Sequence, residues 1–306
     1  MSPARGAPRT RRYRPRLPVD LRLTLFPLQR AGRTDPAVRV GAREAWRATR
    51  NVDGVATVRY AIDGDWIEVE AWGPGAALEL ERAPELLGDS DSLEGFRPRH
   101  KVVADLARRL AGLRITRSRA VFESLVPTIF EQKVIGAEAR AGYGRMIRRL
   151  GEEAPGPAGL MAPPSAARLA RTPYFDFHRF ALERRRAETL IGAARRAAWL
   201  EAAAELAPEA ARARLTSLPG IGPWSAAEVM MVALGDADAV SVGDYHLPHV
   251  VAWALAGQRR GDDSMMLELL EPYRGHRGRV LRLLSAGGLG PPRRGPRLAL
   301  RRMELS

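Results

Sequence analysis

The sequence predicts an α+β fold, in which a small N-terminal antiparallel sheet domain precedes an all-helical body. Apolar and polar residues alternate in short runs from about residue 17 to residue 83, as they do in half-buried strands. After Arg97-Pro98 the apolar residues instead recur at helical spacing, up to about residue 288. A chain of 306 residues that is 45% hydrophobic can bury the cores that both parts need.

The predicted sheet domain spans residues 17–97. Its clearest alternating runs are residues 19–26, 55–62 and 65–72, the last of which reads DWIEVEAW. The turn pairs Asp53-Gly54 and Asp63-Gly64 stand between such runs, which is typical of β-hairpins. We expect an antiparallel sheet with one or two helices packed on it.

The two ends of the chain are predicted to lie outside the folded domains. Residues 1–16 are rich in arginine, contain no acidic residue and carry several prolines, so we expect a disordered basic arm. Residues 289–306 are expected to form a basic tail. The first residues lack the apolar core of a secretory signal, and no run approaches the roughly 20 apolar residues of a membrane span. We therefore expect a soluble, cytoplasmic, nucleoid-associated monomer.

The helical body is predicted to span residues 98–288. A Pro/Gly-rich connector at residues 152–164 interrupts it. After a first helix whose apolar face includes Val103 and Leu106, helices are expected at about residues 118–135, 138–150, 164–171, 178–198, 200–214, 223–234, 244–257, 263–271 and 276–285.

Composition restricts the classes of function. The formal net charge of +14 favours a partner with dense negative charge, most often nucleic acid, although a biased genome composition also enriches arginine. The chain has no cysteine, which excludes disulfides, thiolate zinc sites and iron–sulfur clusters held by cysteine. Charge alone therefore does not establish nucleic-acid binding, and a binding motif is needed as further evidence.

Such a motif is the segment LPGIGPWSA at residues 218–226, between two predicted helices. Glycine permits positive φ and close backbone approach, and Pro223 suits the first position of a helix. The N–H groups of Gly220, Ile221 and Gly222 could hold a DNA phosphate without any side chain. The alternative is an ordinary glycine-capped connection between helices.

With Asp244 twenty residues after Trp224, this segment resembles the helix-hairpin-helix motif of the DNA glycosylase superfamily, closest to the 3-methyladenine DNA glycosylase II family. Residues 119–139 resemble that family's glutamine-containing helix-turn-helix, and residues 272–284 its last core helix. The resemblance covers residues 17–288 and implies the same order of a sheet domain and a helical body.

The resemblance implies a catalytic role for Asp244. Its carboxylate would stabilise an oxocarbenium-like sugar and orient or deprotonate the attacking water. A cap for the following helix, starting at Tyr245, is the structural alternative. Members that also cut the DNA backbone carry a lysine where this chain has Trp224, so hydrolysis without AP-lyase activity is expected.

Further residues take their expected roles from the same resemblance. Gln132 and Lys133 occupy the wedge position that fills the gap left by a flipped base, unless they form a solvated helix end. Trp224 either lines the base pocket or packs the hairpin. Glu228 and Arg282 stand where the family has a tyrosine and a tryptophan, so the pocket that attracts cationic bases is depleted, unless these two residues simply pair.

The expected function is hydrolysis of the N-glycosidic bond of damaged purines in duplex DNA, with alkylated bases favoured, in base-excision repair. No cofactor is required, although the family's hairpin can hold Na⁺, K⁺ or Mg²⁺ through main-chain carbonyls that map to Thr216, Leu218 and Ile221. The alternatives are a glycosylase for deaminated or oxidised bases, a non-catalytic helix-hairpin-helix DNA-binding protein, and a structural or regulatory scaffold.

Overall fold

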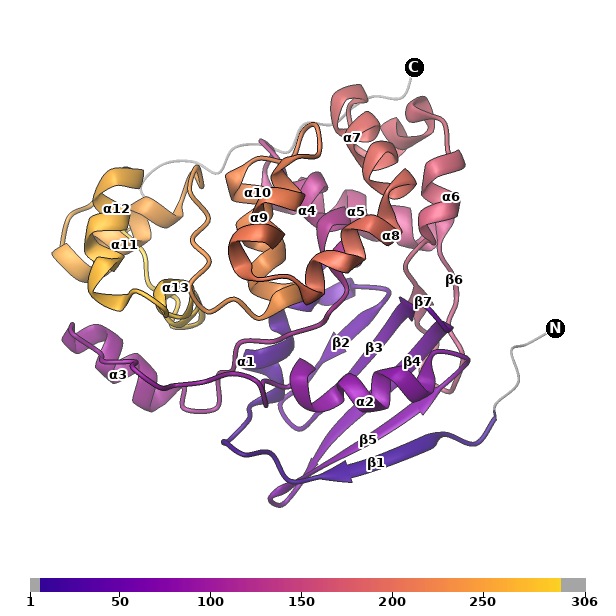
Figure 1. The fold of residues 1–306 in the computed structure, drawn as a ribbon, viewed down its shortest axis with the longest axis horizontal. Helices are drawn as coiled ribbons and strands as arrows, with labels where there is room; N and C mark the ends of the chain where they lie inside the picture. The colour runs from indigo at the N-terminus through magenta and orange to yellow at the C-terminus, as the bar shows by residue number, and fades with distance from the viewer. Residues whose placement is uncertain (1–5, 293–306) are drawn as a thin grey trace.

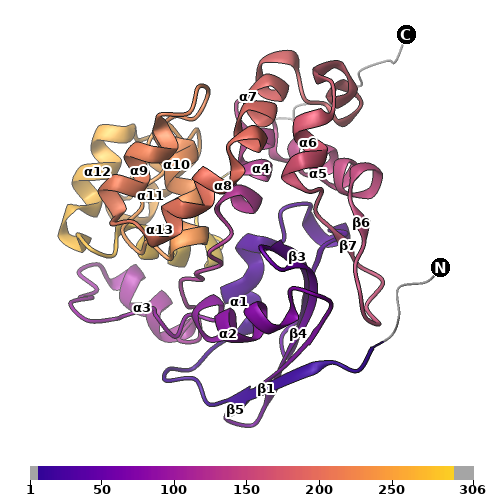
Figure 2. The same cartoon turned by 45° about the vertical axis from the view of Figure 1, so that its right-hand side comes forward.

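The computed structural model describes residues 6–292 and contains an antiparallel sheet at the N-terminal end and helices over most of the rest (Figure 1). Figure 2 shows the helices gathered on one side of the sheet. This mixed content agrees with the predicted α+β class. The domain limits at residues 97 and 288 stay predictions. Among residues 6–292, no helix combines the length and the apolar character that crossing a lipid bilayer requires.

The sheet has five antiparallel strands in the order β1-β5-β4-β3-β2. Their bounds are β1 Arg9–Tyr13, β2 Val38–Val40, β3 Glu44–Asn51, β4 Gly54–Asp63 and β5 Trp66–Trp72. The hairpins β3–β4 and β4–β5 close with two-residue loops, since Asn51 pairs with Gly54 and Asp63 with Trp66. Gly64, with φ at 58°, supplies the left-handed conformation that such a tight loop needs. The two predicted hairpins are therefore present.

The alternation seen in the sequence places one face of the sheet in a core. Val58, Tyr60, Ile67 and Val69 point from β4 and β5 into a buried cluster, together with apolar residues of helices α1 (Leu21–Leu25) and α2 (Ala76–Leu86). Burial of such side chains supplies most of the stability of a small sheet. This core holds α1 and α2 against the sheet.

The prediction of a disordered arm over residues 1–16 is wrong for its second half. Arg9–Tyr13 forms the edge strand β1, which pairs with β5 along its whole length. The Arg11 guanidinium donates to Leu80 O at 2.9 Å, and Arg12 contacts Asp63 at 2.8 Å. Arginine-rich edges suit exposed strands, because charged side chains discourage pairing with other chains. Residues 1–5 of the predicted arm and residues 293–306 of the predicted tail lie outside the described residues.

Most predicted helices are present in the body. Their bounds are α3 Lys101–Arg109, α4 Val121–Glu131, α5 Gly136–Leu150, α6 Ala166–Arg171, α7 Arg184–Arg195, α8 Ala197–Glu201, α9 Pro208–Thr216, α10 Pro223–Val229, α11 Leu247–Ala256, α12 Asp263–Leu270 and α13 Arg277–Ala286. The last turns of the predicted helix 223–234 are π-helical, over Met230–Leu234.

Three regions of the body differ from the prediction. The helix expected at 200–214 is divided into the end of α8, a 3₁₀ turn at Ala202–Glu205 and α9. The helix expected at 178–198 is divided into a 3₁₀ turn, Tyr174–Phe180, and α7, because Ala181 adopts a left-handed conformation with φ at 60°. The connector at 152–164 contains a short antiparallel pair, β6 Glu152–Glu153 and β7 Met161–Ala162, so the body is not wholly helical. Ala154 and Ala162 of this segment pack against Ala48 of the main sheet.

Two helical cores make up the body. One is built mainly from the helices between α4 and α10, and the other from α3 and α11–α13. In Figure 1 these two groups lie side by side above the sheet. The connection between them, residues 235–246, carries Asp244 and ends at α11. The predicted catalytic residue therefore stands where the two groups of helices join.

Candidate active site

Asp244 is held by three N–H donors. Its Oδ1 accepts the backbone N–H groups of His246 at 2.7 Å and Leu247 at 2.8 Å, and its Oδ2 accepts the indole N–H of Trp224 at 3.0 Å. The first two bonds form an Asx turn immediately before α11, whose N-cap is His246 and whose first residue is Leu247, two residues later than expected. Both oxygens of the carboxylate are thus fixed in orientation, with lone pairs still free for a reacting group.

Trp224 reaches Asp244 because of how α10 begins. Gly222 is the N-cap of this helix and Pro223 its first residue, as predicted, so Trp224 follows in the first turn. The side chain is half-buried and its only polar group is bonded to Asp244. The sequence suggested that Trp224 either lines a pocket or packs the hairpin; in the structure its indole N–H also orients the carboxylate.

The hairpin turn needs glycine at position 220. Gly220 has φ at 87°, and a Cβ there would collide with the side chain of Thr189 on α7. Ile221 N–H donates to Leu218 O at 3.0 Å and closes the turn. Among residues 6–292, only Gly220 and Gly222 of the three predicted N–H donors have no protein acceptor, and both residues are exposed. The predicted phosphate site is therefore reduced to two N–H groups.

The side chains of Gln132 and Lys133, just after the end of α4, have different surroundings. The Gln132 side chain donates to Gly220 O and to Ser225 Oγ, each at 2.9 Å, so it braces the hairpin rather than projecting from the surface. Lys133 is exposed and has φ at 54°, which is uncommon for a residue with a side chain. Of the two wedge candidates, Lys133 is therefore the one that projects.

Glu228 and Arg282 do not form the pair that was expected. Glu228 Oε1 accepts the Ser241 hydroxyl at 2.6 Å and its Oε2 lies 4.0 Å from Arg30, whereas Arg282 donates to Leu23 O at 2.9 Å. Both groups are influenced by burial. It raises the pKa of the Glu228 carboxyl, which Arg30 opposes, and it lowers the pKa of Arg282 to about 10, which the charge of Glu228 opposes.

The segment after α1 contributes residues that the sequence analysis missed. Arg30 forms a salt bridge with Glu131, next to Gln132, and approaches Glu228 from the other side. Phe26 is exposed on the same segment, between Leu23 and Arg30. Nothing in the local pattern marks Arg30 as a site residue. Its role depends on how the sheet domain packs against the body.

Tyr245 was also missed. Its side chain is 79% exposed, directly after Asp244 and with its ring against those of His246 and His249. An aromatic residue beside a candidate catalytic aspartate was the available signal. An exposed ring at this place can stack on a nucleobase.

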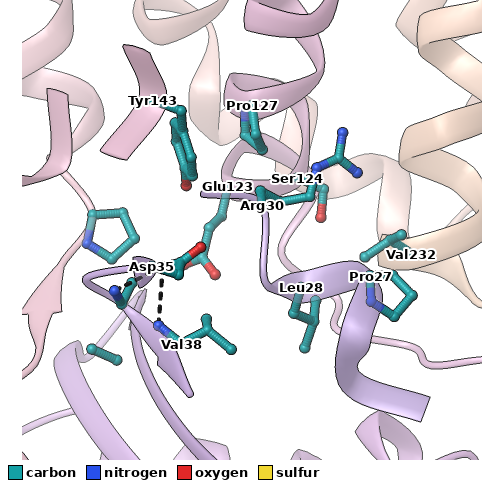
Figure 3. A pocket seen from close by; sticks show the side chains of 13 residues that line it. Pro27, Leu28, Arg30, Asp35, Val38, Glu123, Ser124, Pro127, Tyr143 and Val232 are labelled. Atoms are coloured by element: carbon teal, nitrogen blue, oxygen red, sulfur yellow. Dashed lines mark hydrogen bonds between the residues drawn. The ribbon is translucent and has the colours of Figure 1, made fainter. Parts of the chain in front are cut away.

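A small cavity lies between α4, α5 and the sheet (Figure 3). It measures about 20 Å³, enough for one or two water molecules, and Arg30, Asp35, Glu123 and Tyr143 line it. Asp35 accepts the N–H groups of Ala37 and Val38, and burial raises the pKa of its carboxyl. Of these four residues, only Arg30 also lies close to Glu228. We therefore assign the cavity to the interface between the sheet and the body.

The carbonyls expected to hold a cation fit that role. No described group donates to the carbonyl oxygens of Thr216 or Ile221, and Leu218 O accepts only the bond that closes the turn. Oxygen donors of this kind suit Na⁺, K⁺ or Mg²⁺. Among residues 6–292, no cluster of three or more His, Cys, Asp or Glu side chains could hold a metal ion.

A comparison with protein-family profiles found no match, and a comparison with curated protein sequences found none. Solved structures do match. The 3-methyladenine DNA glycosylase of Archaeoglobus fulgidus superposes with a TM-score of 0.72 at 21% identity, covering 90% of this chain and 97% of that one. The apo 8-oxoguanine glycosylase/lyase of Clostridium acetobutylicum gives 0.57 at 14% identity, covering 81% and 98%.

A third match is the 3-methyladenine DNA glycosylase of Schizosaccharomyces pombe in complex with abasic DNA, with a TM-score of 0.52 at 15% identity. It covers 64% of this chain and 95% of that one. At these identities the likeness concerns the fold. All three neighbours are DNA glycosylases, and two of them superpose on 81% or more of this chain. The chain has the fold of the helix-hairpin-helix DNA glycosylases.

Proposed function

We propose that the protein is a monofunctional DNA glycosylase that hydrolyses the N-glycosidic bond of damaged purines, alkylated ones above all. The observation that carries the proposal is the Asp244 carboxylate, held by three N–H donors beside the hairpin in a glycosylase fold. A carboxylate fixed in this way is preorganised to face developing positive charge, which is the largest single contribution in many enzymes.

In the proposed reaction the bond between C1′ of the sugar and the base nitrogen breaks, and its electron pair leaves with the base. Asp244 stabilises the oxocarbenium-like sugar that results. A water oxygen then bonds to C1′, and its proton passes to an Asp244 oxygen. An alkylated base is already cationic, so the proposed reaction needs no acid to help it leave.

The absence of lyase activity is part of the proposal. A Schiff base needs an amine, and Trp224 occupies the hairpin position where one would be expected. Lys101 and Lys133 are the only lysines in the chain. Lys133 projects at the end of α4, so it is the side-chain amine to test.

We further propose that duplex DNA lies across the hairpin, with a backbone phosphate on the N–H groups of Gly220 and Gly222. Lys133 would fill the gap left by the flipped base, and its strained backbone supports a functional role. A cation on the carbonyls of Thr216, Leu218 and Ile221 would bridge the protein and the phosphate. We propose that the protein acts as a monomer. Its place of action would be the cytoplasm, on the DNA of the nucleoid.

A second candidate function has a specific observation in its favour. Glu228 and Arg282 bring opposite charges and hydrogen-bonding groups to the place where aromatic faces would attract a cationic base. Glu228 remains 25% exposed, so it is accessible from outside. Paired donors and acceptors suit a neutral base, and a deaminated or oxidised purine is therefore the alternative substrate.

One experiment tests these proposals together. Wild type and Asp244→Asn are incubated with duplexes that contain a methylated, a deaminated or an oxidised purine, and released base is scored. We expect the variant to lose about 100-fold or more in rate. Full activity of Asp244→Asn would contradict the mechanism. Tight duplex binding without release of any of the three bases would favour a non-catalytic DNA-binding protein.

The same reactions report on lyase activity. Strand cleavage is scored before and after alkali, and borohydride is added to trap any imine. We expect cleavage only after alkali and no trapped complex for wild type or for Lys133→Arg. A complex trapped with wild type and lost in Lys133→Arg would instead assign lyase chemistry to Lys133.

A further inference from the structure

A second feature of the body lies away from Asp244. A pocket of about 370 Å³ opens between the end of α5, α6 and the 3₁₀ turn Tyr174–Phe180. Its charged lining residues are Arg149, Arg168, Arg171, Arg179 and Asp176. Leu150 and Phe180 form part of its apolar lining. The pocket therefore combines four guanidinium groups with one carboxylate.

The positive charge of this pocket is largely uncompensated. Asp176 contacts Arg179 at 3.4 Å, but in the part of the chain that the structure describes no carboxylate lies within 4.0 Å of the guanidinium groups of Arg149, Arg168 or Arg171. Their guanidinium groups also have no hydrogen-bond acceptor there. The three guanidinium groups that line the hollow are therefore free to bind an anion, and what sets them apart from other exposed arginines is that they share one pocket.

This arrangement matches the chemistry of a phosphate. A guanidinium presents a planar fork of N–H donors that fits phosphate oxygens, and several such groups around one concave site raise the local concentration of anions. We propose that this arginine pocket binds phosphate groups, and that their source is the backbone of the DNA duplex that flanks the damaged base. The choice of DNA rests on the proposed function, whereas phosphate binding does not.

The position of the pocket supports DNA as the source. Helix α7 begins five residues after Arg179, and its Thr189 packs against Gly220 of the hairpin. In Figure 1, α4 and α10 lie between the end of the body that carries α6 and α7 and the end that carries α11 and α12. The N-terminal half of α7 also exposes Arg185.

The length of helix α5 gives the distance between Lys133 and the pocket. The helix starts three residues after Lys133 and runs for 15 residues to Leu150, which lines the pocket. At 1.5 Å per residue this is roughly 22 Å. We place the duplex along α5. Because a duplex advances 3.4 Å per base pair, the pocket then meets phosphates about six base pairs from the flipped base. A short duplex should not reach it.

The test compares two variants that remove the same charge. The first is Arg149→Ala/Arg168→Ala/Arg171→Ala. The control is Arg97→Ala/Arg99→Ala/Arg109→Ala, three exposed arginines in and before α3, at the opposite end of the body. Duplex affinity is measured against salt concentration, with one duplex of about 24 base pairs and one of about 10 base pairs centred on the lesion. Thermal unfolding confirms that each variant folds.

We expect the slope of log K against log salt to fall by about 2 to 3 for the pocket variant on the long duplex, because each lost phosphate contact removes about 0.9. The control should keep the wild-type slope, and the pocket variant should match wild type on the short duplex, where base release also stays unchanged. An equal fall in the control, or in the pocket variant on the short duplex, would overturn the assignment to DNA beyond six base pairs.

A titration with inorganic pyrophosphate separates the two sources of phosphate. If wild type binds pyrophosphate, the pocket variant does not, and the slope on the long duplex is unchanged, the pocket serves a free phosphate compound and the DNA assignment is wrong. If the pocket variant equals wild type in both measurements, the pocket does not bind phosphate at all. Neither result depends on whether Asp244 is catalytic, so failure here is distinct from failure of the proposed function.

Discussion

The indole N–H of Trp224 donates to Oδ2 of Asp244 at 3.0 Å, and this bond joins the hairpin to the loop that carries the candidate catalytic carboxylate. The backbone N–H groups of His246 and Leu247 hold Oδ1. The hairpin therefore has two tasks in the proposed function. It offers N–H groups to a phosphate, and it sets the angle at which Asp244 faces the sugar.

Trp224→Phe tests the second task. Phenylalanine keeps most of the apolar contact of the ring but removes its only donor. A hydrogen bond to a charged group is worth about 1.5–3 kcal/mol, so we expect base release to slow by roughly 10- to 100-fold. Single-turnover rates on a long duplex measure the effect. An unchanged duplex affinity is the control, and an unchanged rate would show that the indole donor is dispensable.

Gly220→Ala tests the hairpin turn together with Thr189. A methyl group at position 220 meets the Thr189 side chain and must also adopt a positive φ. We expect weaker duplex binding, and partial recovery when Thr189→Ala removes the collision but leaves the backbone strain of about 1–2 kcal/mol. Fluorescence anisotropy of the two single variants and the double variant measures this coupling. Additive losses would contradict the contact.

Glu228→Gln tests the partly buried carboxyl through the pH dependence of stability. Burial raises the pKa of Glu228 above its ordinary value of 4.5, so the folded state holds this proton more tightly than the unfolded state. Its contribution to stability is present below pH 4.5 and is lost as the pH rises through the raised pKa. As the pH rises through this raised pKa, we expect Glu228→Gln to become more stable relative to wild type. The difference in Tm between the two proteins measures this change. Glu188→Gln, at an exposed position, should show no such trend.

Glu123→Gln tests the interface between sheet and body. The Glu123 carboxylate on α4 contacts Arg47 at 2.7 Å and Thr49 Oγ at 2.6 Å, both on β3, and the Arg47 side chain is only 3% exposed. The variant loses a charged hydrogen bond but leaves Arg47 its second partner, Glu79 at 3.4 Å, so the free energy of unfolding should fall by about 1.5–3 kcal/mol. Chemical denaturation measures this. Glu188→Gln breaks the exposed pair with Arg184 and should cost less than about 1 kcal/mol.

Tyr245→Ala tests the exposed ring beside Asp244. Stacking of a base on an aromatic ring is worth about 1–3 kcal/mol, and we expect the affinity for damaged duplex to fall accordingly. Tyr245→Phe keeps the ring and should bind like wild type. If both variants bind equally well, the ring makes no contact with the base.

Much of the site could be predicted because its signals are local. The hairpin turn depends on Gly220, Gly222 and Pro223, whose backbone preferences act within a few residues. Asp244 lies directly before an apolar helix, where a capping carboxylate is stabilised by the first N–H groups. The hairpins of the sheet follow from alternation and from short loops that contain glycine.

Other features depend on contacts between distant parts of the chain. Arg30 reaches Glu131 and Glu228, and Gln132 reaches Gly220, although each pair is roughly ninety residues or more apart in sequence. A long polar side chain has the same local preferences whether it faces solvent or a partner, so its neighbours decide its role. The same holds for Arg9–Tyr13, which became a strand because β5 offered an edge to pair with.

The sequence by itself therefore determined the order of sheet and helices, the hairpin and the candidate carboxylate, because backbone conformation and apolar spacing are set by near neighbours. Only the tertiary structure decided that Trp224 orients Asp244, that Glu228 faces Arg30 rather than Arg282, and that four arginines share one pocket. Those relationships arise from packing, which brings together side chains that local preferences do not connect.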